Sequence, residues 1–154
     1  QTGNDNTDAQ PEVLCCVGDL ATGIGAADIT EIEFITTAFD KSDGGNIDVR
    51  VRFNEQVTVN TSGGTPTLTI TNDTPSRNLT ATYLSGSTTN ELIFRKTIAA
   101  ANAATNAGDV LSIAANAMAL ASGTIKDTAD GSTNATITNS GAIGTAAGTI
   151  TVAA

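Results

Sequence analysis

Residues 47–53 read IDVRVRF, in which apolar and polar side chains alternate without interruption. Successive side chains of a β-strand point to opposite faces, so this alternation predicts a strand with one face in a core and the other in solvent. The expected core positions are Ile47, Val49, Val51 and Phe53, and the expected solvent positions are Asp48, Arg50 and Arg52. The pattern breaks at Asn-Glu-Gln and then resumes, which predicts a bend followed by a second strand.

Other short segments with strand composition follow at even spacing. They are residues 29–36 (ITEIEFIT), 56–60 (QVTVN), 66–72 (PTLTITN), 79–84 (LTATYL) and 91–98 (ELIFRKTI). Segments rich in Gly, Ser, Thr, Asn and Pro separate most of them, as turns require. Short, evenly spaced strands predict an all-β fold, an antiparallel β-sandwich.

The alanine-rich stretch 97–123 is ambiguous, because alanine favours helix. Recurrent Asn and a Gly-Asp pair interrupt it, so we expect one helical turn near 99–104 and then strands around 110–114 and 118–120. Residues 123–127 and 134–138 are expected to complete the sandwich.

Three parts are expected along the chain. Residues 1–28 are a polar arm and an apolar lead-in, residues 29–140 the sandwich, and residues 141–154 a Gly-rich hinge with a terminal strand. That last strand has two alternatives: it pairs within the domain or extends to a neighbouring chain.

Charge and composition exclude several classes of partner. The net charge is -9 with only seven Lys and Arg, which cannot form the cationic surface that nucleic acid requires. An anionic membrane surface is not expected as a partner for the same reason. No run of about 18 apolar residues is present, so membrane insertion is not expected. Aromatic residues make up only 3% of the chain, which disfavours the alternative of a carbohydrate-binding module.

Histidine is absent, which excludes Ser-His-Asp triads and His-ligated metal sites. A general base would have to be a carboxylate, a lysine or Tyr83. Glu31 and Glu33 share one face of an expected strand. A glycosidase would need two such carboxylates across a cleft, but the alternation places them on the solvent face. We therefore expect no enzymatic activity.

No cofactor is expected, with calcium as the alternative. Asp40, Asp43, Asn46 and Asp48 supply oxygen ligands near one turn. Asp and Asn are also ordinary turn residues, and the spacing is not that of an EF-hand loop. Residues 127–131 (DTADG) repeat this argument more weakly. Residues 85–90 (SGSTTN) are either a polar binding tip or simply a hairpin connection.

The only cysteines, Cys15 and Cys16, are adjacent, so a disulfide between them would be strained. The favoured interpretation is a pair of small, partly buried thiols, with metal binding and an interchain bridge as alternatives.

Five blocks in order carry a family resemblance. They are VRFNEQVTV (51–59), GTPTLTI (64–70), TATYLSGSTTNELIF (80–94), LSIAANAMAL (111–120) and GTIKDTADGSTNATIT (123–138). In this order the blocks resemble the immunoglobulin-like repeats of very large surface proteins of cyanobacteria and marine bacteria. Lys96 stands where those repeats often carry an aromatic residue, and the DTADGST segment is longer than their usual turn.

The resemblance implies an immunoglobulin-like β-sandwich with a structural or adhesive role and no catalysis. Marine bacteriophages often carry such modules on capsids and tails. By that analogy we expect a virion decoration or cement-type protein located on the phage particle. The alternative is an adhesin or surface-layer module on the bacterial cell surface.

The expected partners are protein subunits, either capsid or tail proteins or further copies of the chain, bound by strand addition through the two ends. The candidate partner-binding residues are Val13, Leu14, Cys15, Cys16 and Val17 near the N-terminus and Ile150 and Val152 near the C-terminus.

Overall fold

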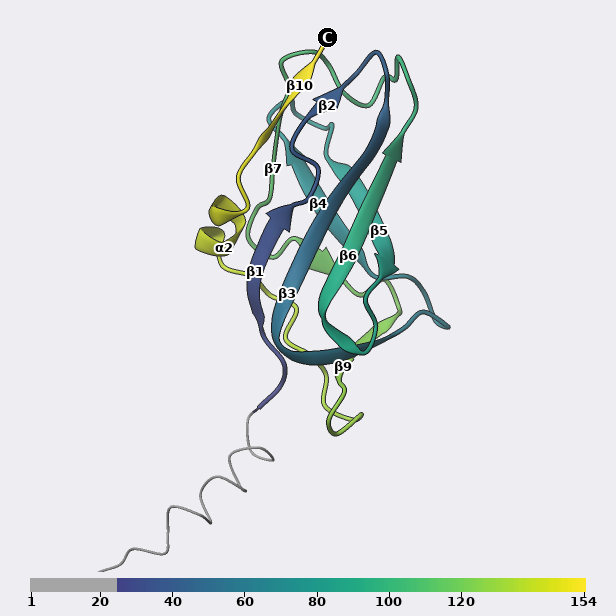
Figure 1. Cartoon of the computed structure of the whole chain (residues 1–154), viewed down its shortest axis with the longest axis vertical. Coiled ribbons are helices and arrows are strands. Elements are labelled where there is room, and N and C mark those ends of the chain that lie inside the picture. The colour runs from purple at the N-terminus through teal and green to yellow at the C-terminus, as the bar shows by residue number, and fades with distance from the viewer. Residues whose placement is uncertain (1–24) are drawn as a thin grey trace, which may run out of the picture.

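The computed structural model describes residues 25–154, which form an all-β fold with one short helix (Figure 1). The strands are β1 (Ile29–Phe34), β2 (Phe39–Asp40), β3 (Gly45–Asn60), β4 (Thr67–Asn72), β5 (Leu79–Ser85), β6 (Thr89–Ile98), β7 (Val110–Ser112), β8 (Met118–Ala119), β9 (Thr124–Asp127) and β10 (Ile150–Ala153). The helix is α2 (Gly141–Ala146).

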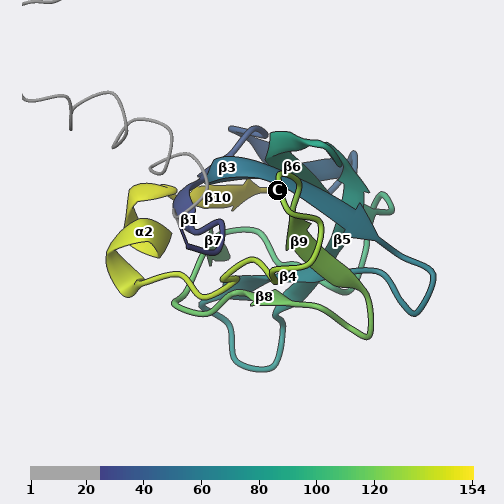
Figure 2. The same ribbon diagram turned by 90° about the horizontal axis from the view of Figure 1, so that it is seen from below.

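The strands follow one hydrogen-bonded path in the order β1-β3-β6-β5-β4-β7-β10-β2. Off this path, β8 pairs with β4 and β9 pairs with β3. The path curls around the core, so that β3 and β6 lie on one side and β4 and β8 on the other (Figure 2). All strand pairs are antiparallel except β10 with β2, which is parallel.

The parallel pair corrects the expectation of a wholly antiparallel arrangement. The parallel pair arises because the chain changes its pairing partner between β1 and β2. The chain pairs with β3 through β1, crosses over residues 35–38, and then pairs with β10 through β2 at the other end of the path.

The alternation in β3 is confirmed, because Ile47, Val49, Val51 and Phe53 are all buried. They join Phe94, Leu68, Ile70 and the other core residues in one hydrophobic cluster. The bend is confirmed as well, although β3 stays a single strand of 16 residues. Its register shifts between Arg52 and Val57, and beyond that point β3 pairs with β9 from Val57 to Asn60.

The expected helical turn at 99–104 is wrong, because these residues form turns. Ala101 has a φ of 50°, outside the right-handed helical region, and Asn102 accepts hydrogen bonds from Thr105. The helix occurs instead at α2, where the Ser140 side chain accepts a hydrogen bond from the Ile143 amide as an N-cap. Residues 134–138 make only isolated bridges, so the strand expected there is also wrong.

Candidate functional site

The outer face of β1, β3 and β6 carries a continuous ion-pair network. Arg50 lies 2.5 Å from Glu33 and 3.5 Å from Glu91. Arg52 lies 2.6 Å from Glu31 and 2.7 Å from Glu91, so Glu91 joins the two arginines. The hydrogen bond from Arg52 holds the pKa of Glu91 below its ordinary value.

This network includes Glu31 and Glu33, the pair of carboxylates that a glycosidase would require. Cross-strand register places Glu31 opposite Arg52 and Glu33 opposite Arg50, and each carboxylate binds the arginine it faces. Both glutamates therefore lie on the outer face that the alternation predicted, in charge-balancing contacts with arginine.

The four calcium candidates are not brought together. Asp40, Asp43 and Asn46 line a shallow pocket of about 410 Å³ beside β10. Asp48 instead lies on the outer face, 2.7 Å from Arg95. The side chain of Asp48 therefore belongs to the ion-pair face of β3, apart from the turn that carries the other three candidates.

Two of the other candidates, Asp40 and Asn46, are hydrogen-bonded to groups of the protein. The Asp40 carboxylate accepts hydrogen bonds from the Ser42 hydroxyl and amide, which lower its pKa. Asn46 Oδ1 accepts a hydrogen bond from the Thr97 hydroxyl. Within residues 25–154, no three His, Cys, Asp or Glu side chains gather closely enough to hold a metal ion.

The second acidic loop, 127–131, is held by turn chemistry. Asp130 accepts hydrogen bonds from the Thr133 hydroxyl and from the amides of Thr133 and Ser132, and these lower its pKa to about 2. Asp127 Oδ1 accepts from the Ala129 amide. These hydrogen bonds fix the conformation of the loop, and the carboxylates of Asp127 and Asp130 are their acceptors.

The 85–90 loop is a hairpin connection that bonds both within itself and to the strands β5 and β3. The Ser87 amide donates to the Tyr83 hydroxyl at 2.9 Å, and the Val59 amide donates to Ser87 Oγ at 2.9 Å. Thr89 Oγ1 contacts the Gly86 carbonyl oxygen at 2.7 Å. The small polar side chains that suggested a binding tip therefore stabilise the turn itself.

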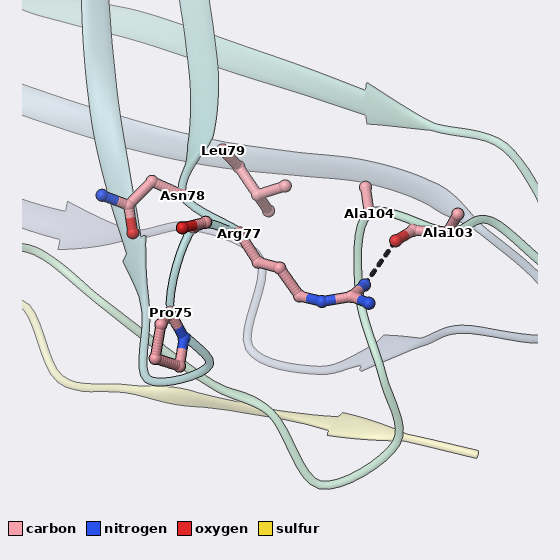
Figure 3. A pocket seen from close by; sticks show the side chains of 7 residues that line it. Pro75, Arg77, Asn78, Leu79, Ala103 and Ala104 are labelled. Atoms are coloured by element: carbon pink, nitrogen blue, oxygen red, sulfur yellow. Dashed lines mark hydrogen bonds between the residues drawn. The ribbon is translucent and has the colours of Figure 1, made fainter.

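A pocket that the sequence did not suggest lies between the β4–β5 loop and residues 103–104 (Figure 3). Its volume is about 400 Å³, and its residues are Pro75, Ser76, Arg77, Asn78, Leu79, Ala103 and Ala104. Arg77 extends across it and donates a hydrogen bond to the Ala103 carbonyl oxygen. This bond joins the two loops.

The buried carboxylate Asp109 anchors the same region. It accepts hydrogen bonds from Asn72 Nδ2 at 2.7 Å, from Thr74 Oγ1 at 2.8 Å and from the Asn106 amide at 2.8 Å. Burial alone would raise the pKa of Asp109, but these hydrogen bonds, with the positive charge of Arg77, lower it. No local motif marks these residues, because they meet only when the loops fold together.

The partner-binding candidates fall into two groups. Val13, Leu14, Cys15, Cys16 and Val17 lie outside the described residues. Ile150 and Val152 lie on β10, between β7 and β2, and each side chain is only 1% exposed. The terminal strand β10 therefore pairs within the domain and does not extend to a neighbouring chain. Its apolar side chains contact the chain's own core.

Comparisons with family models, curated proteins and solved structures find no match to this chain. No helix in the described part of the chain has the length and apolar character needed to cross a bilayer.

Proposed function

We propose that the chain is an immunoglobulin-like structural module without catalytic activity. The observation that carries this proposal is the strand order. When the path is divided at the β4–β5 pair, β1-β3-β6-β5 follows the A-B-E-D order of immunoglobulin sheets and β2-β10-β7-β4 follows A′-G-F-C. A first strand divided between the two series, as β1 and β2 are here, supports the same assignment.

The proposed role is decoration of a bacteriophage virion through contacts with neighbouring capsid or tail subunits. Two points support this role: the resemblance of residues 48–138 to surface-protein repeats, and the apolar run 13–17 that follows the polar residues 1–12. Since β10 pairs inside the domain, the N-terminal segment is the end assigned to partner binding. An extended apolar segment suits strand addition to the sheet edge of a neighbouring subunit.

Deletion of residues 1–20 tests this role. We expect the truncated chain to lose particle association in co-sedimentation and to keep a cooperative urea unfolding transition, as a folded domain does. Deletion of residues 1–10, which leaves the apolar run in place, is the matched control and should retain association. Undiminished association without residues 1–20 would exclude the proposed arm.

A second candidate is a module of a bacterial cell-surface adhesin or surface layer. The five sequence blocks favour it, because they resemble repeats that occur in tandem in such proteins. It predicts further sandwich repeats in the coding sequence on either side of this stretch. Sequencing those flanks distinguishes a repeat array from a virion module.

A further inference from the structure

Helix α2 lies beside β1 (Figure 2), and a groove runs between the helix and the sheet. Its volume is about 500 Å³, and its residues are Thr30, Glu31 and Arg52 on the sheet side and Ala142, Ile143 and Ala146 on the helix side. Ala142 and Ala146 are exposed, and Ile143 is half-buried. The helix therefore presents a methyl-rich wall to solvent along this groove.

The opposite side of α2 fixes the helix in place. Gly144 is buried, and a Cβ built on it would lie 2.4 Å from the Ile113 carbonyl oxygen, so the helix backbone contacts the β7–β8 connection directly. Asn139 ties the same connection by accepting from the Ala117 amide and donating to the Ala114 carbonyl oxygen, both at 2.9 Å. Because α2 is held on that side, the groove is a fixed feature of the fold.

The floor of the groove suits an apolar occupant. Arg52 is bound on one side by Glu31 and on the other by Glu91, so its charge is balanced within the protein. An apolar side chain placed over this pair has a smaller desolvation cost than one placed over an unpaired arginine. The remaining wall is aliphatic, and covering it removes apolar surface from water.

We propose that the apolar run Val13–Val17 of the same chain occupies this groove. The described residues start at Gly25, five positions before Thr30, and the Asp28 amide is fixed to Asn54 Oδ1 at 2.7 Å. Five residues span at most about 17 Å, and the eight from Val17 to Gly25 reach about 26 Å, so the run reaches the groove with slack. A short tether also gives the run a millimolar effective concentration, which favours its own groove over that of a second copy.

This contact goes beyond the proposed assembly role, because it concerns the free chain. In the full chain with Cys16→Ser, Cys15 is the only thiol and accepts a nitroxide label. We expect the label to reduce the amide NMR signals of Thr30, Ala142 and Ala146 several-fold. The loop 61–66 between β3 and β4, on the other side of the molecule from α2 in both views, should keep its signals (Figures 1 and 2).

Two substitutions separate docking from chance proximity. Leu14→Asp in the labelled chain should restore the groove signals, and the matched change Thr7→Asp should not. In the unlabelled chain, Leu14→Asp should also shift the Ile143 methyl resonance, which checks docking without the nitroxide. Uniform or absent broadening together with an unshifted methyl resonance would overturn the proposal.

Mixing distinguishes the chain's own segment from that of another copy. When isotope-labelled chains without nitroxide are mixed with nitroxide-bearing chains without isotope, the groove signals should remain intact. Loss of those signals in the mixture would identify a second copy as the occupant and overturn the intramolecular contact. Particle association is read separately, so either proposal can fail without the other.

Discussion

At the scale of single residues, Asp109 shows how a polar group can lie inside an otherwise apolar domain. It is 4% exposed, yet three hydrogen bonds satisfy its carboxylate. Two come from the distant residues Asn72 and Thr74, and one comes from the nearby Asn106 amide. A buried carboxylate so bonded holds loops in one arrangement, and removal of any partner leaves polar groups without a bond.

Asp109→Ala should lower the free energy of unfolding by about 1–3 kcal/mol, because Asn72, Thr74 and the Asn106 amide lose their acceptor. Urea denaturation at neutral pH measures the loss. Asp43→Ala, an exposed aspartate on a turn, is the control and should change stability little. Equal effects of the two changes would contradict the role given to Asp109.

The contribution of Asp109 to the free energy of unfolding is expected to depend on pH. The pKa of Asp109 is lowered by folding, so its stabilisation is present above the unfolded pKa and is lost as pH falls through the folded pKa. The stability difference between the wild type and Asp109→Asn should therefore shrink in acid, below about pH 4. Urea midpoints measured from pH 7 to pH 3 check this, and a constant difference would contradict it.

At the scale of elements, β3 joins two strand pairings through its bend, and the bend carries acidic groups. The carboxyl of Glu55 lies within hydrogen-bonding reach of that of Asp127. This contact raises the pKa of Glu55, and burial and the charges of Asp127 and Asp28 raise it further. The bend is therefore held less firmly when Glu55 is ionised.

Glu55→Gln should stabilise the domain at neutral pH, because the folded chain binds the Glu55 proton more tightly than the unfolded chain does. In the wild type this contribution is fully present below the unfolded pKa and is lost as pH rises through the folded pKa. The gain from the substitution should accordingly vanish below about pH 4. Glu33→Gln, which removes an ion pair with Arg50, should not stabilise, and a Glu55→Gln gain that persists in acid would contradict this explanation.

Helix α2 offers a matched pair of glycines. Gly144→Ala should cost about 1–3 kcal/mol despite the higher helix propensity of alanine, because the new methyl meets the Ile113 carbonyl oxygen. A methyl at Gly141 meets nothing within 4 Å, so Gly141→Ala should be neutral or stabilising by up to about 1 kcal/mol. Thermal unfolding of both variants tests the docking of the helix, and a tolerated Gly144→Ala would contradict it.

The elements also show where sequence reasoning succeeds. Alternation located β3 and its buried face, because the period of two is a local property of the chain. It could not locate α2, or the turns at 99–104, where contacts override the helix preference of alanine. The parallel pairing of β10 with β2 and the Asn72–Asp109 bond depend on long-range contacts, which no local pattern encodes.

At the scale of the whole molecule, the two terminal strands of the hydrogen-bonded path, β1 and β2, are consecutive in the sequence. β1 ends the path on one side and β2 on the other, and only residues 35–38 separate them. The segment before α2 bonds beside β1 through the Thr136 amide and the Ala27 carbonyl oxygen at 2.8 Å, and α2 follows it along the same side. Because α2 and the segment before it cover the edge of β1, strand addition at that edge is limited. The proposed contact with a neighbouring subunit is therefore given to the N-terminal segment.

Imaging the native particle or filament by electron cryomicroscopy tests the proposed function most directly. The account predicts that residues 25–154 form a sandwich on the outer surface, with residues 1–24 leading into a neighbouring subunit. Density in which the N-terminal segment contacts no neighbouring subunit, or particles that lack the chain, would contradict it.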